Sequence, residues 1–118
     1  MTPKITDPTL RTKKTQKIYV DYVTNKYDHH CIFCAKDDLI KEYEHWILVE
    51  NKYPYDAIFS THNMLAPKAH VTERTKLYKD EIEELDELLQ ELDYDMCILN
   101  KKKRRSIPQH YHLHLVKL

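Results

Sequence analysis

Apolar positions recur with two different periods along this chain. From about Lys14 to Lys26, and again from about Leu77 to Leu92, they return at helical spacing, and acidic residues occupy the other face of the second segment. Both patterns predict amphipathic helices that bury one side. Short apolar and β-branched runs that stop at turn-forming residues predict strands. These runs span residues 39–43, 45–50, 62–66, 94–100 and 110–118.

Two helices and a small antiparallel sheet make an α+β domain. A chain of 118 residues is long enough for one such domain and too short for two. Residues 1–14 are polar, contain Pro3 and Pro8 and show no apolar period, so we expect a loose N-terminal arm. The domain itself is predicted to span residues 15–118.

The sequence contains no glycine. Phosphate-binding P-loops, dinucleotide-binding GxGxxG turns and GxSxG nucleophile elbows all need glycine, because the backbone there turns sharply or approaches the ligand closely. These three classes of site are therefore excluded, and a nucleotide would have to be bound in another way.

Charge and cysteine content indicate the compartment and the partners. The 19 basic residues balance the 19 acidic ones, so no net field would attract nucleic acid or an anionic membrane. The longest apolar run covers only Trp46–Val49, and the N-terminal residues contain no apolar signal segment. Three cysteines fit a reducing compartment. We expect a cytoplasmic protein with neither a membrane nor nucleic acid among its partners.

Three histidines alternate with apolar residues near the end of the chain. On a strand, alternate side chains point to opposite faces, so His110, His112 and His114 are predicted to line one face while their neighbours enter the core. Neutral imidazole is a competent nucleophile near pH 7, and a second imidazole can contact a phosphate or protonate a leaving group. The row predicts phosphoryl or nucleotidyl chemistry without a glycine loop.

Cys31 and Cys34 form a CxxC pair in an aperiodic segment. With two histidines they would complete a tetrahedral zinc site, whereas the pair alone is equally compatible with redox chemistry. A thioredoxin-type pair follows a strand and opens a helix, but this one follows the polar DHH sequence, which favours zinc. Cys97 lies in a predicted apolar strand and is expected to be buried. His45 and His62 are interpreted as ordinary strand histidines.

The histidine row resembles the signature of the histidine triad proteins. It reads His110, Tyr111, His112, Leu113, His114, Leu115, Val116. Upstream, HWILVENKYPYD is similar to the strand and turn ahead of that family's site, and HNMLAPKAHV is similar to its strand ending in Pro-Lys-x-His. The resemblance covers about Cys31 to Leu118 and implies a histidine triad-like fold.

The resemblance also implies roles for individual side chains. His112, the middle histidine, would be the nucleophile that becomes nucleotidylated, and His114 would contact the phosphate and assist the leaving group. Asn51 matches the position that holds the ribose hydroxyls, and Asn100 resembles the family's amide contact to phosphate. Without the resemblance, both asparagines would be interpreted as turn or strand-end residues.

In zinc-bearing members the remaining metal ligands correspond to His70 and His110, so the resemblance implies a structural zinc held by these histidines and the CxxC pair. The approach to the triad departs from the family, because KKKRRSIPQ replaces a glycine-bearing segment. Ser106, a candidate contact to the nucleotide, stands four residues before His110 with Pro108 and Gln109 between them.

These features predict a nucleotide hydrolase or transferase that acts at the α-phosphorus of a nucleoside phosphoramidate or a dinucleoside polyphosphate through a covalent His112 intermediate. The partner would be the nucleotide substrate, and the resemblance implies a homodimer as one assembly. One alternative is a zinc-stabilised module that binds nucleotides or RNA without turnover, and another is a metal-storage or redox protein. The basic run Lys101–Arg105 would favour the polyphosphate if it lies beside the site, but it is also compatible with a solvated loop.

Overall fold

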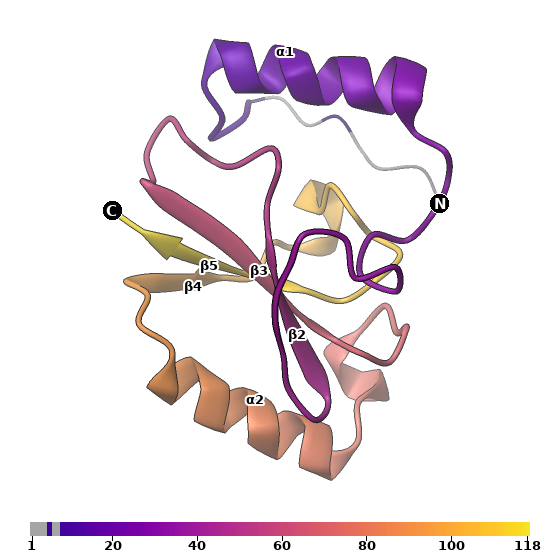
Figure 1. Ribbon diagram of the computed structural model, residues 1–118, viewed down its shortest axis with the longest axis vertical. Helices are drawn as coiled ribbons and strands as arrows, with labels where there is room; N and C mark the ends of the chain where they lie inside the picture. The colour runs from indigo at the N-terminus through magenta and orange to yellow at the C-terminus, as the bar shows by residue number, and fades with distance from the viewer. Residues whose placement is uncertain (1–4, 6–7) are drawn as a thin grey trace.

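Five antiparallel strands form one sheet in the order β1-β2-β3-β5-β4 (Figure 1). The computed structural model describes residue 5 and residues 8–118. The strands are β1 (Leu39–Glu42), β2 (Trp46–Glu50), β3 (Thr61–Pro67), β4 (Met96–Ile98) and β5 (Leu113–Lys117). The helices are α1 (Lys13–Asp21), which continues as the π-helical turn η1 (Tyr22–Lys26), and α2 (Lys79–Glu91). Short 3-10 turns, η2 (Arg74–Lys76) and η3 (Lys102–Arg104), lie in the connections.

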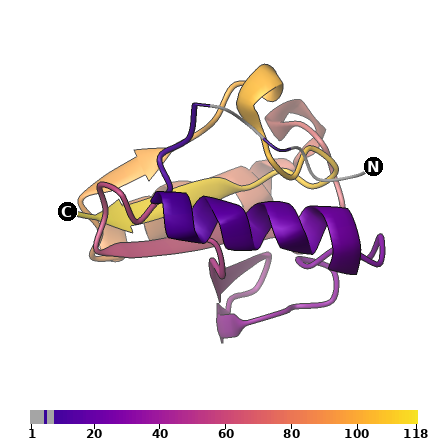
Figure 2. The same ribbon diagram turned by 90° about the horizontal axis from the view of Figure 1, so that it is seen from above.

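The two helices lie on opposite sides of the sheet (Figures 1 and 2). Side chains alternate between the faces, so Leu65 and Leu113 pair across β3 and β5 on the side of α2, while Met64 and His114 pair on the other. The α2 face is an apolar core in which Leu85 is fully buried. The opposite face carries the histidines and is covered by the CxxC loop and the N-terminal elements.

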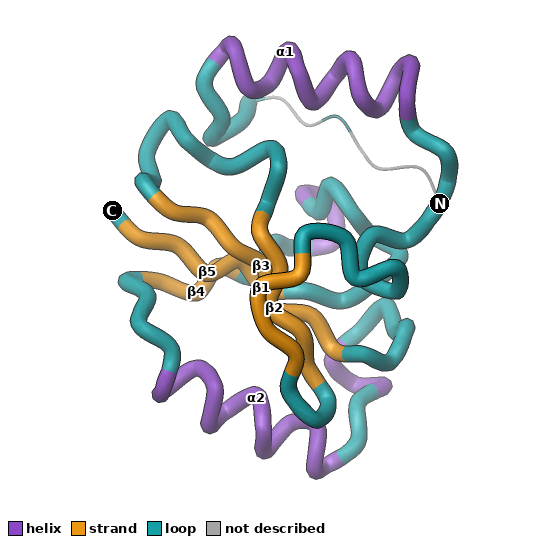
Figure 3. The backbone as a smooth tube through the Cα atoms, in the orientation of Figure 1, coloured by secondary structure: helices purple, strands orange, loops and turns teal. Residues whose placement is uncertain are grey.

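The α+β class, the antiparallel sheet and the two helices are confirmed. Each predicted strand is present, with ends that differ by a few residues, and the basic run is an irregular connection that contains η3. Loops connect elements that pack on both faces of the sheet, as the tube in Figure 3 shows. In the described part of the chain, no helix is both long and apolar enough to cross a membrane.

The last strand begins at Leu113, so the predicted start at His110 was wrong. The reason lies in the backbone hydrogen bonds of the segment before it. The Tyr111 N–H donates to the Val71 carbonyl (2.6 Å) in a loop, and the His110 carbonyl accepts from the ring of His112 (2.8 Å). These groups are engaged outside the ladder, so the first two histidines stand on an extended segment that leads into β5.

Cys97 is exposed, and the prediction that it is buried was also wrong. It lies on β4, whose only strand partner among the described residues is β5. An edge strand leaves side chains near the sheet margin open to solvent, and sequence patterning does not reveal which strand lies at the edge.

Candidate active site and metal-binding cluster

The buried histidines form one continuous group on the α1 side of the sheet. His114 on β5 and His62 on β3 have ring centroids 4.8 Å apart, and His112 lies 5.0 Å from His114. The ring of Phe33 packs against His112 at 5.0 Å and against His110 at 5.1 Å. All four histidines are less than 5% exposed, so packing restricts each imidazole to one orientation.

The hydrogen bond of His112 determines which of its ring nitrogens carries the proton. Its Nδ1 lies 2.8 Å from the carbonyl oxygen of His110, and a carbonyl oxygen can only accept. Nδ1 therefore carries the proton, and Nε2 keeps its lone pair. Burial lowers the pKa of His112 to about 4, so the ring is neutral near pH 7 and Nε2 is available as a nucleophile.

A chain of hydrogen bonds gives His114 the opposite tautomer. The Tyr55 backbone N–H donates to Nδ1 of His62 (2.9 Å), so the neutral His62 ring carries its proton on Nε2. That proton is donated to Nδ1 of His114 (2.7 Å), which leaves the His114 proton on Nε2. The middle and last histidines of the row thus offer different groups at Nε2: His112 has a lone pair there, and His114 has an N–H donor.

The surroundings keep both His62 and His114 neutral. Burial, followed by the positive charge of Arg11, lowers the pKa of His62 to about 3. Burial also lowers the pKa of His114 well below its ordinary value. A neutral donor and a neutral nucleophile can therefore lie side by side without charge repulsion.

Four side chains from distant parts of the sequence meet next to the row and could hold a metal ion. The ligand atoms of Cys31, Cys34, His70 and His110 all lie within 4.8 Å of one another. The individual contacts are Cys31 Sγ to His110 Nδ1 at 3.4 Å, Cys34 Sγ to His70 Nδ1 at 3.1 Å, Cys34 Sγ to His110 Nδ1 at 3.7 Å, and His70 Nδ1 to His110 Nδ1 at 3.1 Å.

These separations fit a tetrahedral metal site. Metal–ligand bonds of about 2.0–2.3 Å place the corners of a tetrahedron about 3.3–3.8 Å apart, close to the distances between these donors. His110 donates its Nε2 proton to the Pro67 carbonyl (2.7 Å), which leaves the lone pair of Nδ1 directed at the cluster. Two sulfur and two nitrogen donors with this orientation suit zinc, and both cysteines are free thiols.

The CxxC loop reaches this position through a single helical turn that ends without glycine. The Ala35 N–H donates to Cys31 O, Lys36 N–H to Phe33 O and Asp37 N–H to Ile32 O, which is the Schellman pattern. Its left-handed position is occupied by Lys36, with φ 55°. A residue with a Cβ is less favourable there than glycine, so the rest of the loop must stabilise this turn.

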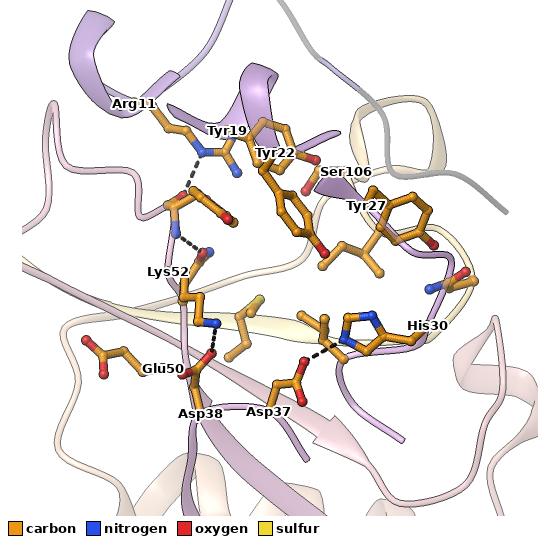
Figure 4. Close-up of a pocket in the computed structure, with 16 residues that line it drawn as sticks. Arg11, Tyr19, Tyr22, Tyr27, His30, Asp37, Asp38, Glu50, Lys52 and Ser106 are labelled. Carbon is orange, nitrogen blue, oxygen red and sulfur yellow. Dashed lines mark hydrogen bonds and ion pairs between the residues drawn. The ribbon is translucent and has the colours of Figure 1, made fainter. Parts of the chain in front are cut away.

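A pocket lies between the N-terminal helical segment and the histidine face (Figure 4). It contains about 780 Å³ of empty space, part of it open to solvent. One wall is tyrosine-rich, with the rings of Tyr22 and Tyr53 stacked at 5.3 Å. None of the four buried histidines lines it, but Met64, the cross-strand neighbour of His114, and Gln109, the residue before His110, both do, so the pocket lies next to the residues that carry the row.

The structure brings Asn51, Asn100 and Ser106 to this region in different ways. Asn51 lines the pocket, and its Oδ1 accepts the Tyr53 N–H (2.8 Å) in an Asx turn. Asn100 Nδ2 lies 3.4 Å from His114 Nε2 and donates to the Tyr55 hydroxyl at 3.0 Å. Ser106 is buried in the pocket wall and forms a hydrogen bond with the Tyr19 hydroxyl.

Sequence reasoning missed two residues of this site. His62 was interpreted as an ordinary strand histidine, although it sets the tautomer of His114. The available signal was its position on the strand that ends in the Pro-Lys-x-His motif, two residues before Met64. Arg11 lies within the range predicted as a loose arm, yet it is 6% exposed and lines the pocket. No sequence pattern indicated its burial.

The basic run is partly committed to structural contacts. Arg105 donates to the carbonyls of Asn100 and Thr72, each at 3.1 Å, and lies 3.6 Å from a Glu73 carboxylate oxygen. Lys102 lies 3.7 Å from the same oxygen, and Arg104 donates to the Pro8 carbonyl. These contacts connect the run to the N-terminal segment at Pro8 and to the loop at Thr72 and Glu73. The bond from Arg105 to the Asn100 carbonyl holds Asn100 next to His114.

Comparison with solved structures identifies the fold. A HIT family hydrolase from Legionella pneumophila Philadelphia 1 is 22% identical with a TM-score of 0.53, over 73% of this chain and 90% of that one. A hypothetical histidine triad nucleotide-binding protein from Sulfolobus tokodaii strain 7 is 18% identical with a TM-score of 0.58, over 74% and 68%. A HIT family hydrolase from Clostridium thermocellum is 19% identical with a TM-score of 0.55, over 76% and 91%.

No protein-family model matches the chain, and no curated protein is detectably similar to it. At these identities the structural matches establish the fold, which is that of the histidine triad proteins. The expected resemblance is therefore confirmed at the level of architecture.

Proposed function

We propose that this protein is a nucleotide hydrolase or transferase that cleaves a bond at the α-phosphorus of its substrate through a covalent intermediate on His112. The observation that carries the proposal is the pair of tautomers in the row. A lone pair on His112 Nε2 and a proton on His114 Nε2, held 5.0 Å apart between ring centroids, are the two functions that such a displacement needs. The histidine triad hydrolases with this fold support the same class of chemistry.

In the first step, the lone pair of His112 Nε2 attacks the α-phosphorus and a nitrogen–phosphorus bond forms. The bond from phosphorus to the leaving group breaks, and the leaving atom takes its electron pair and is protonated by solvent, while the Nε2–H of neutral His114 donates a hydrogen bond that stabilises the developing negative charge. The attacking ring becomes cationic as it is phosphorylated. Its Nδ1 proton already points at the His110 carbonyl oxygen, 2.8 Å from Nδ1, and the carbonyl dipole stabilises the positive charge that develops on the ring.

In the second step, water or another acceptor attacks the same phosphorus from the side that the leaving group vacated. The attacking molecule loses its proton to solvent, and the Nε2–H of His114 again donates a hydrogen bond to the charge that develops. The nitrogen–phosphorus bond breaks, its electrons return to His112, and the nucleotide is released. His112 recovers its starting tautomer and His114 keeps its own, because the hydrogen bonds to the His110 carbonyl and from His62 are unchanged by the cycle.

The pocket beside the row is the proposed site of the nucleoside. Tyrosine rings offer faces on which a base can stack, and the stacked pair Tyr22 and Tyr53 is preformed. Asn51, which lines the pocket with its Nδ2 3.4 Å from His62 Nε2, is the proposed ribose contact, and Asn100, 3.4 Å from His114 Nε2, is the proposed phosphate contact. Ser106 lines the same pocket, forms a hydrogen bond with Tyr19 and is the third proposed contact to the nucleotide.

The metal-binding cluster is proposed to hold one structural zinc through Cys31, Cys34, His70 and His110. Four protein ligands complete a tetrahedron, so the ion would stabilise the fold and offer no open position for substrate. His110 belongs to both the cluster and the row, and Phe33 of the CxxC loop packs on His112. The cluster thereby fixes the segment that presents the nucleophile.

Turnover assays with two substrate types test the proposal. Purified protein is incubated with an adenosine phosphoramidate and, separately, with a diadenosine polyphosphate, and released nucleotide is followed by chromatography. We expect release by the wild type and none above background by His112→Ala. His45→Ala is the matched control, because His45 is a partly exposed histidine in the connection between β1 and β2, outside the row. Absence of turnover with tight nucleotide binding would instead indicate the non-catalytic module.

A further inference from the structure

Arg11 is a buried cation without a counter-charge in the described part of the chain. Its side chain is 6% exposed, and no carboxylate of that part forms an ion pair with it. Asp56 is the acid whose charge acts on the pKa of Arg11, but it forms no ion pair with the guanidinium. Its carboxylate accepts hydrogen bonds from Thr12 and Thr15 instead (2.9 and 2.5 Å). A buried cation without a paired carboxylate is costly, so an anionic ligand that reached this guanidinium would be stabilised by it.

The guanidinium retains donors that face the pocket. Nε donates to the Tyr53 carbonyl at 2.6 Å, and Nη1 has a long contact to Gln16 at 3.5 Å. No described acceptor contacts Nη2. The planar group lies over the ring of Tyr19, 4.2 Å from its centroid, and this stacking leaves the edge that carries the Nη donors directed into the pocket (Figure 4). Such an edge matches the oxygens of a phosphate.

The backbone on both sides of Arg11 is held in place. The Leu10 carbonyl accepts the Ala57 N–H at 3.1 Å, and the Thr12 N–H donates to Asp56 at 2.9 Å. The guanidinium is therefore positioned in advance, as an anion-binding residue must be for its desolvation to be offset by the ligand.

The position of Arg11 indicates which phosphate it would bind. The ring of Tyr55 lies between Arg11 and the row: its centroid is 5.2 Å from the guanidinium carbon and 5.1 Å from the His114 centroid. Arg11 is instead bonded to the backbone of Tyr53, whose N–H donates to Asn51, the proposed ribose contact. Its donors thus lie on the ribose side of the pocket, away from the reacting phosphorus.

From this arrangement we infer that Arg11 forms a second phosphate subsite, which selects nucleotides carrying a phosphate ester on the 2′ or 3′ hydroxyl of the ribose in addition to the 5′-phosphoryl group that reacts. The inference rests on the proposed function, since it assumes that the nucleoside occupies the tyrosine-lined pocket. It adds a substrate class, the nucleoside bisphosphates and their 5′-substituted derivatives.

Calorimetric titration tests this subsite. The ligands are the 5′-monophosphates of the four common ribonucleosides, with the 2′,5′- and 3′,5′-bisphosphate of each, and the proteins are the wild type, Arg11→Gln, Arg11→Lys and Lys17→Gln. Lys17 is the matched control, because it is an exposed cation on α1 and its loss lowers the net charge equally. We expect a bisphosphate to bind the wild type at least tenfold more tightly than its monophosphate, which corresponds to about 1.4 kcal/mol.

Arg11→Gln should abolish that gain and leave monophosphate affinity within about threefold, a change of less than ~0.7 kcal/mol. Lys17→Gln should keep the gain. If Arg11→Gln does not unfold cooperatively, Arg11→Lys decides the question, because its single ammonium cannot form the paired bonds and should reduce the gain.

Equal affinity of the wild type for both ligand types would overturn the inference while leaving the proposed function intact. A gain that persists in Arg11→Gln, or an equal loss for both ligand types, would also overturn it, the latter by assigning Arg11 to the reacting phosphate. Failure of every nucleotide to bind the wild type would contradict the proposed function as well.

Discussion

The hydrogen bond between His62 and His114 can be removed while the surrounding contacts are kept. In His62→Asn, the side-chain oxygen can replace Nδ1 and accept the Tyr55 N–H, but the shorter side chain does not reach His114. In His62→Gln, the amide nitrogen can replace Nε2 and still donate to Nδ1 of His114. The two variants differ by one methylene and separate the donor to His114 from the presence of a buried polar side chain.

The magnitude follows from the geometry. The bond is 2.7 Å long, and its two residues are 4% and 2% exposed, so its loss leaves a buried nitrogen without a partner. A buried group left unpaired costs about 1–3 kcal/mol. If that cost falls on the transition state, kcat/KM decreases about 5- to 150-fold in His62→Asn. In His62→Gln, the amide donor should keep kcat/KM close to the wild-type value.

The assay is the initial rate of phosphoramidate hydrolysis at pH 7.5, with thermal unfolding of each variant measured in parallel. The expected result is a lower kcat/KM for His62→Asn than for His62→Gln when both proteins are folded at the assay temperature. Equal rates for the two folded variants would refute the view that His62 acts by orienting the proton of His114.

Other consequences of the structure can be checked by simple measurements. Cys34→Ser should lower the zinc content and the unfolding temperature, because metal binding contributes folding free energy, whereas Cys97→Ser on the exposed edge strand should change neither; equal zinc in both variants would contradict the cluster. Because burial lowers the pKa of His62 to about 3, its contribution to stability is complete above about pH 6.5 and is lost as the pH falls toward 3. Between pH 7 and pH 4, urea titrations should show the wild type losing on the order of 3 kcal/mol more than His62→Gln, and parallel pH profiles would show that the ring is not held neutral. Ser106→Ala should reduce affinity for a nucleoside monophosphate about 2- to 10-fold, since one buried hydrogen-bonding group of the pocket wall is removed; unchanged affinity would place Ser106 outside the nucleotide site.

Periodicity and residue type were sufficient to predict the architecture. The leucine stripe of α2 and the alternating strands predicted an α+β domain because burial of one face imposes these periods. The convergence of Cys31, Cys34, His70 and His110 followed from the resemblance and not from spacing. Their separation of up to 79 positions between Cys31 and His110 has no local signature.

Three features could not be predicted, each for a physical reason. The start of β5 depends on where the carbonyls of neighbouring loops lie, as the bond from Tyr111 to Val71 shows. The tautomers of the row depend on donors brought together by tertiary contacts, above all the Tyr55 N–H on His62. The burial of Arg11 depends on the loop around Asp56, since an arginine in a polar segment is exposed unless tertiary structure covers it.

The central claim is that His112 becomes covalently nucleotidylated, and intact-mass spectrometry tests it most directly. Protein is mixed with excess adenosine phosphoramidate and denatured within the first turnovers at neutral or alkaline pH, because a phosphorus–nitrogen bond to imidazole hydrolyses in acid. The expected spectrum contains a species heavier by one adenylyl group, which maps to the peptide containing His112 and is absent in His112→Ala. Turnover without such an adduct, or an adduct that persists in His112→Ala, would contradict the account.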